Sequence, residues 1–239
     1  MHGDHAGDRH LPAPGAGTCA KPDVSAKATP HTNAANIAIA TGAKIVTGSE
    51  MPKFFAGKLK ALGGDPKKSV LVRFGASTAV GGVTITTVPA AHSNGVAGAM
   101  VGGELGKMLD AAGLTAYAGP PTGYVLTFSN GLVTYLSGDT GMTAEQKTVV
   151  GDHYKAQLAV MNIGDTYTTG PMEAAYVIND LIKPASVIAS HANETGTEGG
   201  KVVGKRTLTF MKAAKVPVHI PLSGRTMSFD GAGKCTAGC

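Results

Sequence analysis

The first residues of the chain hold a cluster of side chains that can bind a metal ion. His2, Asp4 and His5 place two imidazoles and a carboxylate within four residues, next to glycines at positions 3 and 7. Glycine lets the chain turn tightly, and mixed imidazole and carboxylate donors suit a borderline divalent ion such as Zn²⁺. Taken alone, the cluster could equally be a tag remnant or a frayed chain end, so its interpretation depends on the rest of the sequence.

Three further potential ligands, His92, Asp139 and His191, each follow a predicted strand. The strands are rich in β-branched residues and cover 83–90, 132–137 and 186–190. One such residue alone is usually a buried or capping side chain. Together with the N-terminal cluster, the three describe a site for two metal ions that could activate water for hydrolysis.

These motifs resemble those of the metallo-β-lactamase superfamily, whose first motif reads His-x-His-x-Asp-His. The opening MHGDH supplies x-His-x-Asp-His, so the leading histidine would stand one residue before Met1. AAHSN with His92, SGDTG with Asp139 and ASHAN with His191 match the later motifs in order, and almost the whole chain is covered. GDHAGD and the segment 162–193 resemble the branch of L-ascorbate-6-phosphate lactonase-like proteins and related metal-dependent hydrolases.

The resemblance implies a binuclear metal centre in which each matching residue is a ligand. The implied ligands are His2 and His92 with the missing histidine for one ion, Asp4, His5 and His191 for the other, and Asp139 as the bridge. Zn²⁺ is the expected metal and Mn²⁺ the alternative. Asp4 and Asp139 are the expected catalytic residues, because their carboxylates could orient a metal-bound hydroxide or pass a proton to the leaving group. The implied reaction is hydrolysis of a small ester, lactone or phosphoester.

The elements that must position these residues alternate between helices and strands. Apolar spacing predicts helices near 36–42, 51–63, 143–156, 170–183 and 201–215. Extended, β-branched segments predict strands at 44–47, 69–75, 83–92, 124–130, 132–139, 158–164, 186–192 and 216–221. This order predicts an α/β protein, and the resemblance implies a metallo-β-lactamase-like αββα sandwich. A strand should precede the loop that carries the first motif, so we expect the chain to lack its first strands.

The sequence is expected to form a single domain over 1–239, with a long loop at 8–35 and the N-terminal part of the domain missing. Residues 8–35 are rich in proline, glycine, alanine and threonine without a sustained period. Elsewhere no repeat or linker divides the chain, which favours one layered domain.

Composition restricts the partners. The net charge of +5 comes from lysines and arginines scattered along the chain, so we expect no nucleic-acid partner. No apolar run approaches the roughly 20 residues that span a bilayer, so we expect no membrane partner. A small-molecule substrate is the expected partner, and a homo-oligomer is possible. A cytoplasmic location is favoured, with the periplasm as the alternative if an upstream signal peptide is missing.

Several reactive residues are left outside this site. Asp165 follows a buried strand and either supports the metal ligands or holds a turn. His219, in the last predicted strand, is expected to be a surface or packing residue. Cys19, Cys235 and Cys239 are too few for a disulfide framework. The last two could form a small disulfide or a metal clip, although an ordinary tail is favoured.

Two other interpretations compete with an active metal-dependent hydrolase. Asp139-Thr140-Gly141 is also the tripeptide of aspartic proteases, but it lacks the second copy that a shared proton requires. The stronger competitor is a catalytically silent or incomplete metal-binding protein, because the first motif lacks a histidine. In-frame upstream codons for Thr-His would favour the enzyme, and an upstream stop codon would favour the silent protein.

Overall fold

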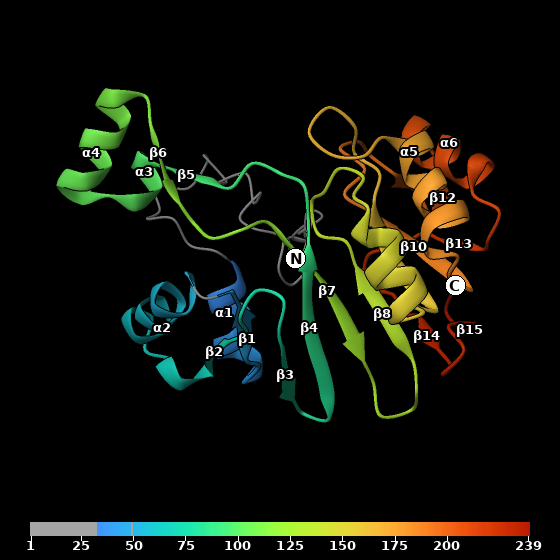
Figure 1. The fold of residues 1–239 in the computed structure, drawn as a ribbon, viewed down its shortest axis with the longest axis horizontal. Coiled ribbons are helices and arrows are strands. Elements are labelled where there is room, and N and C mark those ends of the chain that lie inside the picture. The colour runs from blue at the N-terminus through green and yellow to red at the C-terminus, as the bar shows by residue number, and fades with distance from the viewer. Residues whose placement is uncertain (1–32, 49) are drawn as a thin grey trace, which may run out of the picture.

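The computed structural model describes residues 33–48 and 50–239 (Figure 1). The predicted ligands His2, Asp4 and His5, together with Cys19, lie outside the described residues. The described helices are α1 (Asn33–Thr41), α2 (Pro52–Ala61), α3 (Gly98–Val101), α4 (Gly103–Ala112), α5 (Pro171–Tyr176) and α6 (Lys205–Ala213), with the 3₁₀ turn η1 (Pro66–Lys68) and the π-type helices η2 (Gln146–His153) and η3 (Val177–Ile182).

Most of the described strands belong to one seven-stranded sheet. In the order of their pairing, its strands are β13 (Val218–His219), β10 (Ser186–Ser190), β9 (Leu158–Asn162), β8 (Val133–Leu136), β7 (Thr122–Thr127), β4 (Val83–Pro89) and β3 (Ser77–Val80). The remaining strands form two-stranded pairs: β1 (Ile45–Thr47) with β2 (Ser69–Leu71), β5 (Gly95–Ala97) with β6 (Thr115–Tyr117), β11 (Thr197–Glu198) with β12 (Lys201–Val202), and β14 (Ser228–Phe229) with β15 (Cys235–Ala237).

Strand directions decide which residues meet at the edge of the large sheet. Strands β8, β9, β10 and β13 run parallel to one another. Strand β4 is antiparallel to β7, which is antiparallel to β8, so β4 points the same way as the parallel strands. The carboxyl ends of β4, β8, β9 and β10 therefore lie along one edge.

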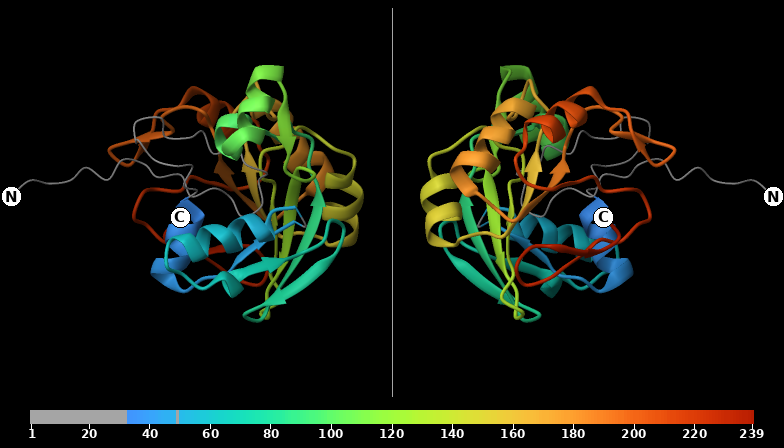
Figure 2. Two further views of the ribbon diagram at one scale, coloured as in Figure 1. Left: turned by 90° about the vertical axis from the view of Figure 1, so that its left-hand side faces the viewer. Right: turned by 90° about the vertical axis from the view of Figure 1, so that its right-hand side faces the viewer.

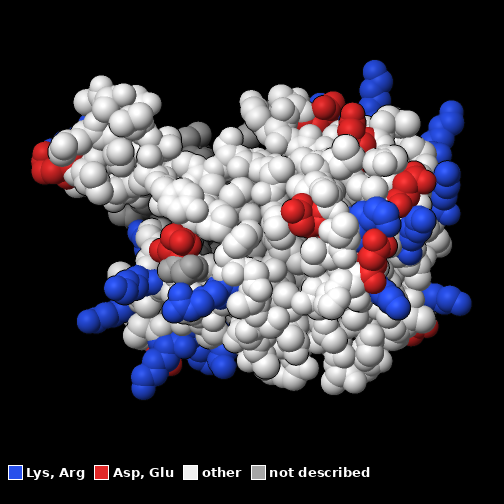
Figure 3. All heavy atoms as spheres, viewed as in Figure 1, with Lys and Arg blue, Asp and Glu red and all other residues white. Residues whose placement is uncertain are grey.

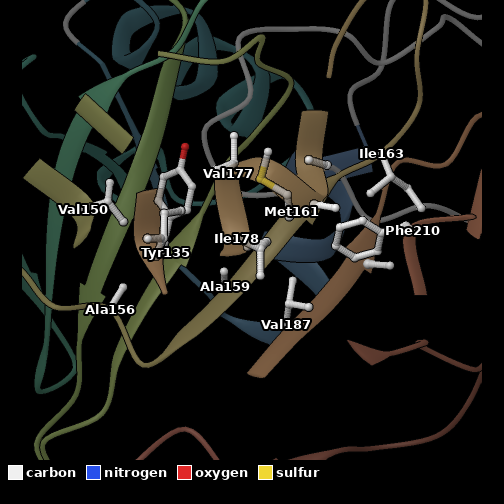
Figure 4. Close-up of a cluster of buried hydrophobic side chains, with 14 of the residues drawn as sticks. Tyr135, Val150, Ala156, Ala159, Met161, Ile163, Val177, Ile178, Val187 and Phe210 are labelled. Atoms are coloured by element: carbon white, nitrogen blue, oxygen red, sulfur yellow. The ribbon is translucent and has the colours of Figure 1, made fainter. Parts of the chain in front are cut away.

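One face of the sheet carries the largest core. Tyr135 from β8, Met161 from β9, Ile178 from η3 and Phe210 from α6 are all fully buried there. Figure 4 shows these side chains converging between the strands and the helices above them. Full burial of one large apolar side chain contributes about 1.5–3 kcal/mol, so this core fixes the parallel strands whose ends carry the candidate ligands.

The other face of the sheet packs against the N-terminal elements. Val72, Tyr124 and Leu136 form a buried cluster between the large sheet and the β1–β2 pair. Helices α1 and α2 pack together through Ala38 and Leu59 on the outer side of that pair. Figure 2 shows the blue helices and the yellow and orange helices on opposite sides of the strands. The layers are thus helix, small sheet, large sheet and helix, which confirms the predicted α/β class.

An arm formed by residues 95–117 projects between β4 and β7, at the upper left of Figure 1. No helix or strand is predicted for this segment from the sequence. Helices α3 and α4 approach closely at Gly98 and Gly106, where an added Cβ would collide with the opposite backbone. Met108 and Tyr117 on the arm are 67% and 70% exposed, so its helices are held by backbone contact rather than by a core.

Three predicted boundaries are wrong. The loop expected over 8–35 ends earlier, because Asn33 already begins α1. The helix expected at 201–215 begins only at Lys205, since Gly199 and Gly200 adopt positive φ and turn the chain into the β11–β12 hairpin. The strand expected to be the last is followed by the β14–β15 hairpin, so the C-terminal segment is not an ordinary tail.

Charged side chains lie mostly around the rim of the face shown in Figure 3. The lysines that are scattered in the sequence gather partly over α2 and η1, where Lys58, Lys60, Lys67 and Lys68 lie within eleven residues. Within the described ranges, no helix has both the length and the apolar character needed to cross a membrane.

Candidate metal centre

His92, Asp139 and His191 all come from loops at the same edge of the large sheet. They follow β4, β8 and β10, which end at Pro89, Leu136 and Ser190. Since these strands point the same way, residues that are almost a hundred positions apart are gathered at one end of the sheet. The predicted position of each residue just beyond a strand is confirmed.

Asp139 and His191 face each other directly. Nδ1 of His191 lies 3.5 Å from Oδ1 of Asp139, and the aspartate side chain is only 10% exposed. Without a metal, this contact is an ion pair whenever the imidazole is protonated. Two donor atoms that share one tetrahedral ion with bonds of about 2.1 Å would stand about 3.4 Å apart, so the pair also fits ligation of a common ion.

The loop of His92 is hydrogen-bonded to the loop of Asp139, although the donor atoms of His92, Asp139 and His191 do not all lie within 4.8 Å of one another. Ala91 N donates to Thr140 Oγ1 at 2.9 Å, and Gly141 N donates to Ala91 O at 2.8 Å. Nδ1 of His92 lies 2.7 Å from Ser93 O. A carbonyl in contact with one ring nitrogen is the usual arrangement for a metal-binding histidine, because it places the lone pair on the other nitrogen.

A buried polar network supports the loop that carries Asp139. The amide Nδ2 of Asn162, which is fully buried, donates to Thr140 O at 3.0 Å and to Thr169 Oγ1 at 2.8 Å. Its Oδ1 lies 3.0 Å from Ser137 Oγ. All of these atoms are satisfied inside the protein, where hydrogen bonds are strengthened by the low dielectric. Asn162 therefore ties the ends of β8 and β9 together behind the candidate ligand.

Sequence reasoning missed Asn162. The available signal was an asparagine at the end of an otherwise apolar strand, a position where a buried amide must find hydrogen-bond partners. The partners themselves come from two other segments, and the sequence does not indicate which ones.

The loop after β10 has an unusual backbone. His191 and Asn193 adopt φ of 44° and 52°, in the left-handed region that residues other than glycine rarely occupy. Ile163 N donates to Ser190 O, and Gly164 packs so closely that an added Cβ would collide with His191 O. Such conformations cost about 1–3 kcal/mol each and cluster at functional sites, so the surrounding contacts hold His191 in place.

Glu194 anchors the far side of the same loop. Its Oε1 accepts hydrogen bonds from Thr207 N at 2.9 Å and Thr207 Oγ1 at 3.1 Å, at the start of α6. Burial opposes ionisation of this carboxyl, but hydrogen bonds from Thr207 and Arg206 outweigh it and hold the pKa of Glu194 below its usual value. The ionised side chain thus stabilises the position of the segment 191–194.

Asp165 is predicted either to support the metal ligands or to hold a turn, and the structure shows it in a turn. Its side chain is exposed, its φ is 61°, and its Oδ1 accepts from Thr166 N at 2.8 Å. The residue therefore shapes the turn after β9.

Comparisons with known proteins bear on the ancestry and the fold of the chain. No protein-family model matches the chain. A UPF0173 metal-dependent hydrolase from Roseiflexus castenholzii is 32% identical over 156 residues, which cover 65% of this chain and 56% of that protein. Another from Polynucleobacter asymbioticus is 32% identical over 112 residues, which cover 47% and 38%. The chain is a homologue of these hydrolases.

A solved structure with a related backbone is a metallo hydrolase from Ignicoccus hospitalis, with a TM-score of 0.52 and 22% identity over 79% of this chain and 70% of that chain. At this identity the likeness concerns the fold alone. The chain matches 38% of the length of the Polynucleobacter protein and 56% of the length of the Roseiflexus protein.

Proposed function

We propose that this UPF0173 homologue is a metal-dependent hydrolase of a small ester, lactone or phosphoester that uses two divalent ions, Zn²⁺ or, as the alternative, Mn²⁺. The observation that carries the proposal is the convergence of His92, Asp139 and His191 at one edge of the sheet, with Asp139 and His191 3.5 Å apart. Two imidazoles and a carboxylate are the donors that such ions accept.

Each residue has a proposed task. His92 would hold one ion together with His2, and His191 would hold the other together with Asp4 and His5. Asp139 would join the two. The N-terminal three lie outside the described residues, so their roles rest on the sequence motif. When bound, two such ions supply a Lewis acid and lower the pKa of water to about 7, which provides hydroxide at neutral pH.

Asp139 has a second task in this proposal. Its carboxylate is nearly buried, and its loop is fixed by Asn162 through Thr140. A fixed carboxylate can orient the nucleophile and accept its proton, and Asp4 would share this role from the N-terminal motif. The small-molecule partner follows from this chemistry, and a cytoplasmic location remains the favoured prediction.

The test combines metal analysis with turnover. Cys235 and Cys239 form a disulfide in the structure. The chain is therefore purified without chelators or a His tag, kept oxidised to preserve this disulfide, and analysed by inductively coupled plasma mass spectrometry. We expect about two Zn or Mn ions per chain. Panels of aryl esters, lactones and phosphodiesters should then be hydrolysed, with activity lost on chelation and restored by the metal.

Asp139→Asn should abolish this turnover. Asp152→Asn is the matched control, because Asp152 lies on the surface, 2.9 Å from Lys147. A folded, oxidised chain with less than about half a metal ion and no turnover that responds to chelation would contradict the proposal and favour the silent protein.

A further inference from the structure

A second group of potential ligands lies at the C-terminal end of the described chain. Nitrogen or sulfur atoms of His219, Cys235 and Cys239 all lie within 4.8 Å of one another, and among the described residues they form the one such group of three. Sequence reasoning treated His219 as a packing residue and the cysteines as part of an ordinary tail. The structure brings all three together.

Strand pairing creates this group. His219 lies on β13, the edge strand of the large sheet, opposite Ile188 of β10. The ring of Phe229 on β14 packs edge-on against the His219 ring, with centroids 5.3 Å apart. Phe229 pairs in turn with Cys235 on β15, so the hairpin register places a sulfur beside the imidazole.

The hairpin is held in position by contacts that do not involve its cysteines. Asp230 Oδ1 accepts from Ala232 N and Lys234 N, both at 2.9 Å, which closes the turn. Ser186 Oγ on β10 donates to Gly233 O at 2.5 Å, which fastens the hairpin to the large sheet. The position of Cys235 beside His219 therefore does not depend on the disulfide alone.

The imidazole has an unsatisfied atom. Nε2 of His219 is buried and has no hydrogen-bond partner among the described residues. Buried polar atoms are normally paired, and an exception calls for an explanation such as a missing ion. One ring nitrogen of His219 lies within 4.8 Å of the sulfurs of Cys235 and Cys239, and in the structure these sulfurs are joined as a disulfide.

We propose that His219, Cys235 and Cys239 form a redox-dependent metal site that binds Zn²⁺ or a similar thiophilic ion when the disulfide is reduced. A dithiol reductant supplies two electrons and two protons, becomes a disulfide itself and leaves two thiols on the protein. Metal binding then displaces both thiol protons, so that two thiolates and one neutral imidazole are the ligands. In the reverse direction, an exchanging disulfide accepts two electrons and leaves as two thiolates, the Cys235–Cys239 disulfide forms again, and the ion is released.

The dimensions suit this chemistry. With Zn–S bonds of about 2.3 Å and Zn–N bonds of about 2.0 Å, the ligand atoms of a tetrahedral site stand about 3.5–3.8 Å apart. The group observed lies within 4.8 Å, so opening the disulfide requires only a local adjustment of the hairpin end. The fourth position would be taken by water.

Co²⁺ provides a test whose signal does not come from the strand-end centre. A thiolate bound to Co²⁺ gives an intense near-ultraviolet charge-transfer band, whereas imidazole and carboxylate ligands do not. The full chain carrying Cys19→Ser, in which Cys235 and Cys239 are the remaining cysteines, is reduced with a water-soluble phosphine, which becomes its oxide. It is then titrated with Co²⁺. We expect a band that rises to saturation as Co²⁺ is added, is absent from the oxidised chain and returns on reduction.

Variants identify the third ligand. His219→Gln should weaken Co²⁺ binding, measured by this band, by about tenfold or more. His153→Gln is the matched control, since His153 is exposed on η2. This variant should bind Co²⁺ with the same affinity as the parent. Circular dichroism checks that each variant is folded. No thiolate band in the reduced parent, or unchanged affinity in folded His219→Gln, would overturn the proposal without affecting the strand-end hydrolase site.

Discussion

The two candidate metal sites differ in how the chain assembles them and in what their ligands can do. At the strand-end centre, imidazole and carboxylate groups come from positions 92 to 191 and meet because their strands share a direction. At the C-terminal hairpin, an imidazole and two sulfurs come from the last 21 residues. Carboxylate and histidine donors leave room for water chemistry, whereas thiolate-rich sites are typically structural or redox-sensitive.

The sites also differ in their support. Behind Asp139 lies a fully buried network centred on Asn162. The hairpin instead packs on an edge strand of two residues and is largely exposed. Rigid support is what a catalytic group needs for precise positioning, while an exposed site can exchange its metal and be reduced. This comparison leads to four predictions, in order of decreasing effect.

Asp139→Asn should give the largest change. Removing a residue that hydrogen-bonds a metal ligand lowers metal affinity or activity by about 10–100-fold. Removing Asp139, the proposed bridging ligand itself, should therefore lower kcat/KM by about 100-fold or more. Steady-state kinetics and metal analysis measure the effect. A variant that keeps full activity and two ions would show that Asp139 is not part of the centre.

Asn162→Ala should weaken both the fold and the strand-end site. It removes one of the two hydrogen bonds of Thr140 O, which keeps Thr169 N, and one of the two of Thr169 Oγ1, which keeps the backbone oxygen of Asn162. The free energy of unfolding should therefore fall by about 1–3 kcal/mol. Affinity for the strand-end ions should fall by about 10–100-fold. Urea denaturation and competition with a chelating dye measure the two effects.

The control for this variant is Asn179→Ala. Asn179 bonds Ala213 O and Lys215 N, away from the sheet edge. The Asn179→Ala variant should therefore have a lower free energy of unfolding but the same affinity for the strand-end ions as the parent. Equal loss of affinity in both variants would mean that the Asn162 network has no specific link to the site.

Cys235→Ser should affect only the sulfur site. In reduced protein saturated with Zn²⁺ and freed of excess metal, the variant should hold about one ion fewer than a Cys19→Ser reference. Metal analysis on matched samples gives the difference. If both proteins contain the same number of ions, Cys235 does not bind the metal as proposed.

Glu194→Ala should have the smallest effect, and it should depend on pH. The carboxylate caps the start of α6, and such a cap contributes about 1 kcal/mol. Because the folded pKa of Glu194 lies below 4.5, the contribution is present above that pH and is lost as the pH falls through the folded pKa. Urea midpoints of the parent and variant should differ at pH 7 and converge in acid.

Glu198→Ala is the matched control for that series, since Glu198 is an exposed glutamate four residues further on. The urea midpoint of Glu198→Ala should equal that of the parent at every pH. A constant difference between the parent and Glu194→Ala across the whole range would show that ionisation of Glu194 does not stabilise the segment.

Several parts of the fold could be predicted because their signals are local. The strands before His92, Asp139 and His191 are runs of β-branched residues, and Pro171 marks the start of α5. The arm at 95–117 could not be predicted, since its contacts depend on two glycine backbones approaching each other. The C-terminal hairpin was missed for a similar reason: its strands are only two or three residues long.

By itself, the sequence determined the α/β class, the strand that precedes each described ligand candidate and the chemistry of the strand-end donors, since side-chain periodicity and residue type are local properties. Only the tertiary structure decided which groups meet. Asn162 finds its partners behind Asp139, and His219 meets Cys235 and Cys239, because strand pairing and register bring together segments that no local pattern connects.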